Sequence, residues 1–225
     1  MGHVFDSDTE VTRRPDGAYG AQITDRWNGL HGMPLGSYGL AISIRALAEH
    51  MALRDPLSVS AHFLRPVEVG PAEVHTEHIR SGRRMATGQA SLSQNGKERL
   101  RAIATFTDLG QFDGRTSLLG ERPQLPPPEE CVDPLDGVAL PNISGLERVD
   151  YRMAEAPGWL RGAPGGTSVC NVYMRFREER ELDPLALLYF WDAMAPVVLD
   201  MGEAPSTTVE ATAHVRCRPA SGWLA

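Results

Sequence analysis

The strongest candidate for a chemically active side chain is Asp192, which stands in the middle of the apolar run LDPLALLYFWDAMAPVVLDM at residues 182–201. Asp183 and Pro184 are typical of a helix start, with Asp as the N-cap and Pro at the first helical position. The pattern predicts a helix from Asp183 to Met201, enclosed by the rest of the protein because most of its faces are apolar. A carboxylate there is costly unless it is paired, hydrogen-bonded or protonated. Asp192 is therefore either a functional carboxylate or a cap for a neighbouring loop.

Two further groups of residues could bind a ligand. Gly36, Ser37 and Tyr38 stand just before the apolar stretch LAISIRALAEHM, and N–H groups at a helix N-terminus can bind a ligand oxygen. An ordinary helix entry turn would use the same residues. Arg83 and Arg84 could contact phosphate groups, although a solvated hairpin end also explains them.

The elements that must position these side chains follow from hydrophobic periodicity and turn residues. A long helix is predicted after the glycine-rich passage, ending near Arg54, because Asp55-Pro56 follows. Asn95-Gly96 is the strongest hairpin signal in the chain. The predicted strands of this first half span residues 18–24, 57–66, 72–79, 85–94 and 98–108.

The second half repeats this order in a shorter form. Strands are predicted at 146–153, 169–177 and 206–218, with the Asp192 helix between the last two. Ser60-Ala61-His62-Phe63-Leu64-Arg65-Pro66 also matches Thr212-Ala213-His214-Val215-Arg216-Cys217-Arg218-Pro219 with one residue inserted. The sequence therefore predicts two copies of one fold, residues 1–109 and 143–225, joined by a proline-rich linker at 110–142. The second copy is about three strands shorter, so we expect it to be incomplete at its C-terminal end.

Composition narrows the class of protein. The chain has 225 residues, 42% of them hydrophobic and 23% charged, and a formal net charge of -7. This composition is typical of a soluble globular enzyme or binding protein and argues against a general nucleic-acid or membrane protein. Cys131, Cys170 and Cys217 are too scattered for a zinc motif or a disulfide framework, which favours a cytoplasmic location.

The sequence resembles the TesB-like acyl-CoA thioesterases. These are α+β proteins with two hotdog folds in one chain, and each hotdog is a long helix wrapped by a curved antiparallel sheet. The resemblance covers nearly the whole chain apart from the ends and the linker. It is carried by Trp27, GSYG before the first helix, SVSAHFLRPVEVGPAEV (58–74), GRRMATGQASLSQNGK (82–97), ATFTDL (104–109), DPLALLYFWDAM (183–194) and TTVEATAHVR (207–216).

The resemblance implies hydrolysis of acyl-CoA thioesters to free acid and CoA, with water as the nucleophile and with no metal or organic cofactor. The family's catalytic trio is an aspartate on the second helix, a threonine or serine on the following strand and a glutamine on the last strand. Asp192 matches the aspartate, and Thr208 is the best match for the hydroxyl, with Thr207 as the alternative. The glutamine is expected on a strand beyond Ala225. In this setting Gly36, Ser37 and Tyr38 would face the acyl carbonyl, and Arg83 and Arg84 the CoA phosphates.

Other functions and properties stay open at this point. One alternative is a hotdog hydratase or dehydratase, an enzyme that uses an Asp/His pair on a different loop-helix pattern. The other is a protein that binds acyl thioesters without cleaving them, which would share the residues named above. The sister position of Asp192 on the first helix lies near the apolar Ile42, so the second helix alone is expected to carry a central carboxylate. Because hotdog proteins commonly pair, the resemblance also implies a homo-oligomer.

Overall fold

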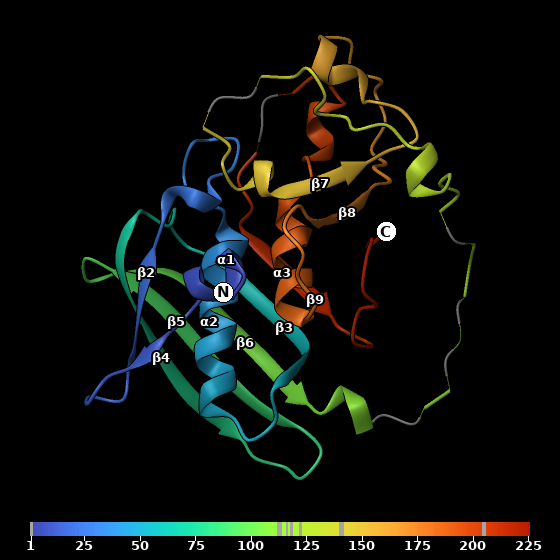
Figure 1. The fold of residues 1–225 in the computed structure, drawn as a ribbon. Coiled ribbons are helices and arrows are strands. Elements are labelled where there is room, and N and C mark those ends of the chain that lie inside the picture. The colour runs from blue at the N-terminus through green and yellow to red at the C-terminus, as the bar shows by residue number, and fades with distance from the viewer. Residues whose placement is uncertain are drawn as a thin grey trace.

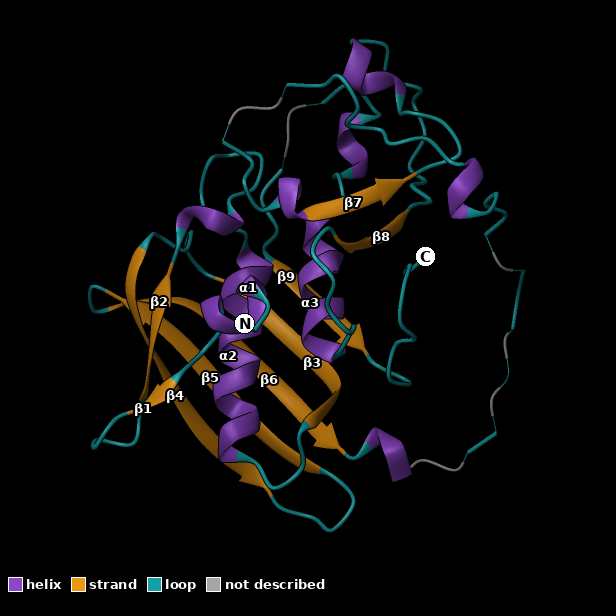
Figure 2. Ribbon diagram, viewed as in Figure 1, coloured by secondary structure: helices purple, strands orange, loops and turns teal. Residues whose placement is uncertain are grey.

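The computed structural model describes residues 2–111, 114–115, 117, 119–121, 123–139, 142–203 and 206–225. The larger part of the protein is one antiparallel sheet wrapped around a helix (Figures 1 and 2). Its helix is α2 (Gly36–His50), and its strands are β1 (Thr12–Arg13), β2 (Tyr19–Ile23), β3 (Asp55–Phe63), β4 (Gly70–Arg80), β5 (Ala86–Gln94), β6 (Lys97–Thr107) and β9 (Glu210–His214).

The first half folds as its periodicity predicts, except that α2 ends at His50 and not near Arg54, and β3 begins at Asp55 and not at Leu57. The seven strands are ordered β1-β2-β4-β5-β6-β3-β9, and alternate side chains of β5 are buried, as expected for a sheet with one face on the core. Asn95 and Gly96 both have positive φ, at 52° and 70°, which matches the predicted tight hairpin between β5 and β6. Helix α2 packs on the inner face of this sheet, because nearly its whole length is apolar or small.

The second half is built around α3 (Pro184–Ala193), which packs beside α2. It also contains a small sheet of β7 (Val149–Arg152) and β8 (Tyr173–Phe176). The predicted extension of this helix to Met201 is wrong. The helix ends at Ala193, because Pro196 disfavours helical backbone in the residue before it and cannot donate to the preceding turn. A short 3-10 turn, Val197–Leu199, follows.

Strand β9 joins the large sheet and does not form a separate one. It pairs antiparallel with β3, and Ser60 lies directly opposite Thr212. The Thr212 hydroxyl donates to Ser60 Oγ at 3.1 Å. The two segments that repeat in the sequence are therefore neighbours in one sheet.

The two halves share an aromatic core. The N-terminal helix α1 (Val4–Asp8) places Phe5 between the rings of Trp27, Phe176 and Tyr189, with centroid separations of 5.1–5.4 Å. All four of these side chains are buried. Because the rings come from four separate segments, α1 stabilises the contact between the first and second halves.

The predicted linker is described in part, and the turn at Pro128–Glu130 lies on the side of the molecule on which the C-terminus is marked (Figure 1). Its described parts include the 3-10 turns Leu109–Gln111 and Pro128–Glu130, and Val132 pairs with Met153 through two backbone hydrogen bonds. The predicted linker also includes positions 112–113, 116, 118, 122 and 140–141, which lie outside the described residues. No helix among the described residues has the length and apolar character needed to cross a bilayer.

Candidate active site

The candidate site is a cavity of about 1080 Å³ at the N-terminus of α2. Asp192, Thr207 and Thr208 line it together with Gly36, and these four residues come from α2, α3 and the segment before β9. Its other walls are mostly apolar side chains of residues 30–35, 63–67, 151–172 and 193–197. An apolar cavity of this size with a few convergent polar groups is typical of a site for a small organic ligand. We refer to it as the main cavity.

Asp192 links the two central helices. Its Oδ2 atom accepts a hydrogen bond from the Ser37 N–H at 2.9 Å. Asp192 is the penultimate residue of α3, where the helix dipole disfavours a negative charge, but the positive N-terminal end of α2 offsets this effect. The α2 N-cap, Leu35, has no side chain that could bind these N–H groups, so a carboxylate from α3 takes that role.

The end of α3 is held in place by a buried phenol. The Tyr151 hydroxyl donates to the Ala193 carbonyl oxygen at 2.8 Å, which satisfies one of the carbonyls left unpaired at the helix C-terminus. Burial raises the pKa of Tyr151, so this phenol stays protonated and remains a donor. Asp192, one residue earlier, is thereby fixed at the edge of the main cavity.

An aromatic pair forms the wall next to Asp192. The rings of Phe63 and Trp191 are stacked, with centroids 6.3 Å apart and planes 22° from parallel. A Cβ atom at Gly36 would lie 2.8 Å from Phe63 Cε1, closer than a carbon contact allows. Glycine at position 36 therefore lets the Phe63 ring approach the α2 N-terminus.

A loop fastened by Asp200 forms another wall. The Asp200 carboxylate accepts hydrogen bonds from the Gly165 N–H, the Thr167 hydroxyl and the Thr167 N–H at 2.9–3.0 Å. These donors, Gly165 first, lower the pKa of Asp200. Sequence reasoning missed this contact, because Asp200 lies about thirty residues beyond the loop that it binds.

The other predicted binding residues lie elsewhere. Tyr38 is fully buried and does not line the main cavity. Its hydroxyl donates to the Asp8 carbonyl oxygen at 2.8 Å, and burial raises its pKa to about 12. Ser37 contributes its backbone N–H while its side chain is buried. Arg83 and Arg84 are exposed at the β4–β5 connection and do not line the main cavity. Their contact with phosphates stays a prediction.

No group of three or more His, Cys, Asp or Glu side chains within the described ranges could hold a metal ion. The polar groups that line the main cavity include the carboxylates of Asp192, Asp200 and Glu155, threonine hydroxyls and the N-terminus of α2. Such groups can hold and deprotonate water and can stabilise a developing oxyanion.

Comparisons with known proteins identify the family. Residues 23–107 match the family model of the acyl-CoA thioesterase N-terminal domain, and residues 126–225 match that of the C-terminal domain. An uncharacterized protein of Mycobacterium tuberculosis is 32% identical over 197 residues, a match that covers 79% of this chain and 66% of that protein. The chain thus spans about two thirds of the length of this relative.

Solved structures agree with this assignment. A putative thioesterase II from Thermobifida fusca superposes with a TM-score of 0.82 at 28% identity, over 97% of this chain and 84% of that one. A protein of unknown function with a hot dog fold from Alicyclobacillus acidocaldarius superposes with a TM-score of 0.78 at 21% identity, over 94% and 78%. The fold is thus that of the hotdog proteins. The chain belongs to the TesB-like acyl-CoA thioesterase family.

Proposed function

We propose that this protein hydrolyses acyl-CoA thioesters to a free acid and CoA in the main cavity, with water as the nucleophile. The observation that carries the proposal is the position of Asp192, a half-buried carboxylate anchored at a helix N-terminus and bordering a large apolar cavity. An apolar wall suits an acyl chain, while the polar edge suits the thioester group. Membership of the thioesterase family supports the choice of substrate class.

The proposed roles follow from the contacts of each group. Because Oδ2 of Asp192 accepts the Ser37 N–H, its Oδ1 is the atom that would hold the water and take its proton. The water oxygen attacks the thioester carbon, the C–S bond breaks, and the proton passes to the CoA sulfur. The Thr208 hydroxyl, or that of Thr207, would orient the water. The N–H of Gly36, at the start of α2, would face the oxyanion.

The architecture that we propose is a double hotdog. Residues 1–109 form the first unit, 143–225 belong to the second, and 110–142 connect them. The pairing of β3 with β9, two strands that repeat in the sequence, supports two related units. A cytoplasmic location and a homo-oligomeric state are further parts of the proposal.

A direct test measures CoA release from a series of acyl-CoAs of increasing chain length with a thiol reagent. We expect release above the non-enzymatic rate for at least one acyl-CoA. A single turnover in ¹⁸O-water then tests the nucleophile, because direct attack by water places one solvent oxygen in the product acid. If Asp192 itself attacked and water then cleaved the resulting anhydride at the aspartyl carbon, the first turnover would give an acid without solvent oxygen and leave that oxygen in the Asp192 carboxylate.

A non-catalytic acyl-thioester binding protein is the second candidate. The hydrogen bond from Ser37 to Asp192 favours it, because this carboxylate already has a structural partner. Such a protein would bind a non-hydrolysable thioether analogue of acyl-CoA and release no CoA from the thioester. The two measurements together separate the candidates.

A further inference from the structure

One wall of the main cavity has almost no regular structure. It is formed by residues 158–169, between β7 and β8. This segment begins with the 3-10 turn Gly158–Arg161 and contains no strand or further helix. Trp159, Leu160 and Val169 are among its residues that line the cavity. We refer to residues 158–169 as the lid segment.

The lid segment separates the main cavity from solvent. Residues 161–169 are all exposed, and Gly165, Thr167 and Val169 among them also line the cavity. This part of the segment therefore faces solvent on one side and the cavity on the other, as a roof does. The side chain of Val169 is 71% exposed, so apolar burial contributes little to holding this part in place.

Asp200 holds the lid segment against the rest of the protein. Its carboxylate accepts the hydrogen bonds from Gly165 and Thr167 given above, and its backbone carbonyl oxygen accepts the Gly166 N–H at 2.7 Å. Every other hydrogen bond of the lid segment within the described residues is internal or joins it to the adjacent Pro157. Asp200 is therefore the latch of this segment.

This latch can open without disturbing the core. The hydrogen bonds of the Asp200 carboxylate lie at the surface, where water replaces a bond that breaks, so opening costs less than breaking a buried bond. Gly162 and Gly166 have φ angles of 72° and 71°. Glycine changes its backbone angles without a side-chain clash, so these two residues are suitable hinges.

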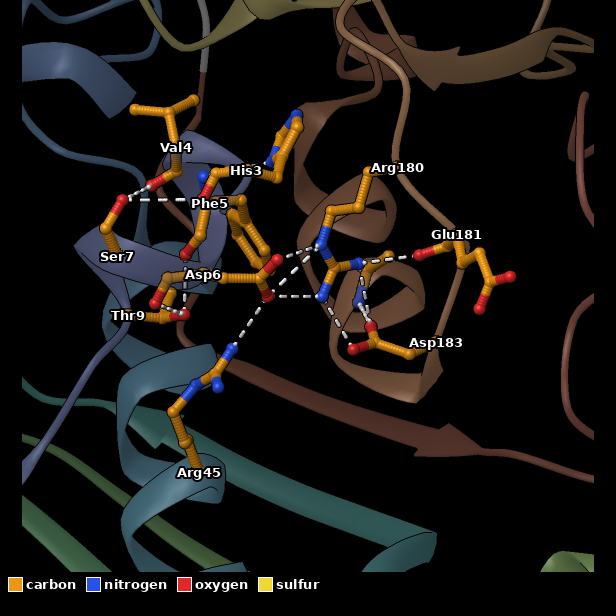
Figure 3. A network of polar contacts seen from close by, with 11 residues as sticks. His3, Val4, Phe5, Asp6, Ser7, Thr9, Arg45, Arg180, Glu181 and Asp183 are labelled. Atoms are coloured by element: carbon orange, nitrogen blue, oxygen red, sulfur yellow. Dashed lines mark hydrogen bonds and ion pairs between the residues drawn. The ribbon is translucent and has the colours of Figure 1, made fainter. Parts of the chain in front are cut away.

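The helices around the cavity are fastened more firmly than the lid segment (Figure 3). Arg180 lies between Asp6 of α1 and Asp183, with Nη2–O distances of 2.8 and 2.6 Å, and only 7% of its side chain is exposed. Arg45 of α2 also pairs with Asp6, at 3.2 Å. Burial disfavours ionised Asp6, but the hydrogen bonds and charge of Arg180, with those of Arg45, outweigh it and lower the pKa of Asp6. These ion pairs keep α1, α2 and α3 in place while the lid segment opens.

We infer that the lid segment opens and closes over the main cavity, that Asp200 latches the closed state, and that an acyl thioester enters and leaves when this latch is broken. The inference rests on the proposed function, because it describes access to the same site. Asp200 holds the lid and has no part in the proton transfer at Asp192.

Cys170 is a natural reporter of lid opening. It follows the lid segment directly, lines the main cavity and is half-buried, whereas Cys217 is exposed and does not line the cavity. Alkylation with N-ethylmaleimide followed by peptide mass mapping measures both thiols in the same sample. Opening of the lid should speed the alkylation of Cys170 and leave that of Cys217 unchanged.

Thr167→Val removes one hydrogen bond of the latch, with Ser168→Ala as the matched control. The Thr167 hydroxyl donates to Asp200 Oδ2 at 2.9 Å, whereas the neighbouring Ser168 hydroxyl makes no hydrogen bond within the described part of the chain. We expect Thr167→Val to raise the alkylation rate of Cys170 by about 3–10-fold and Ser168→Ala to leave it unchanged. Burial, followed by the charge of Asp200, raises the pKa of the Cys170 thiol. Because Thr167→Val keeps that charge, a faster rate reports access to the thiol.

Binding kinetics of the thioether analogue of acyl-CoA give the second measurement. If the latch must open before the ligand enters, Thr167→Val should raise the association rate constant by about 3–10-fold, and the dissociation rate constant by at least as much. A fixed wall predicts an unchanged association rate constant. An unchanged association rate constant, or an unchanged alkylation rate of Cys170, would overturn the lid and leave the hydrolase proposal intact. Both rates raised in a protein that releases no CoA would support the lid and refute the hydrolase.

Discussion

Replacing Gly36 with alanine should disturb the wall beside Asp192. The added Cβ would lie 2.8 and 2.9 Å from Phe63 Cε1 and Cδ1, whereas carbon atoms prefer about 3.5 Å or more. The ring must therefore move by about 0.7 Å, and its stacking on Trp191 opposes that movement. Overpacking of this kind costs about 1–3 kcal/mol. The lower entropy of the unfolded alanine variant offsets about 0.4–1 kcal/mol, which leaves a net loss of about 1–2 kcal/mol.

Thermal unfolding and binding of a thioether analogue of acyl-CoA measure this effect. We expect Tm to fall by about 2–8 °C and Kd to rise by about 5–30-fold if the displaced ring enters the main cavity. Gly114→Ala is the control, since a Cβ there has no heavy atom within 4 Å. The double variant Gly36→Ala with Phe63→Leu should lose less than the sum of the single changes, because the ring that clashes is gone. Wild-type stability and affinity in Gly36→Ala would refute the packing argument.

Three further predictions concern the loop bound by Asp200, the threonine hydroxyl that would orient the water, and the loss of folding stability at acid pH. Asp200→Ala frees the loop that carries Gly165 and Thr167, so KM for acyl-CoA should rise several-fold with a small change in kcat; an unchanged KM would contradict a role for this loop. Thr208→Ala should reduce kcat more than Thr207→Ala, and the reverse order would assign the hydroxyl to Thr207. Asp6 has a lowered pKa in the folded protein, so its contribution to stability is present above its ordinary value of 3.8 and is lost as the pH falls below it. Urea unfolding should show that the free energy of unfolding falls less between pH 6 and pH 3 in Asp6→Asn than in wild type.

Local patterns predicted most of the first half of the fold. The β5–β6 hairpin follows from Asn95-Gly96, and α2 follows from its apolar stretch, because both depend on residues close together in the chain. The apolar pattern overestimates the length of α3, which ends at Ala193. The apolar pattern continues through Val198, but Pro196 interrupts the backbone hydrogen bonds, and this effect outweighs the periodicity.

The site could be predicted only in part, since its contacts join distant segments. The apolar setting of Asp192 marks it as a candidate, but its partner Ser37 lies 155 residues away in the chain. Tyr38 illustrates the opposite error of local reasoning. It stands two residues after Gly36 in the sequence, yet a helix turns by roughly 100° per residue, and the phenol is buried against Asp8 instead of facing the cavity.

The measurement that tests the central claim most directly is the rate of CoA release by Asp192→Asn compared with wild type. Glu155→Gln is the matched control, because it also removes a carboxylate that lines the main cavity. We expect Asp192→Asn to lose about 10²–10⁴-fold in kcat while still binding the thioether analogue, and Glu155→Gln to keep wild-type turnover. An Asp192→Asn variant that releases CoA at the wild-type rate would contradict the assignment of Asp192 as the group that activates water.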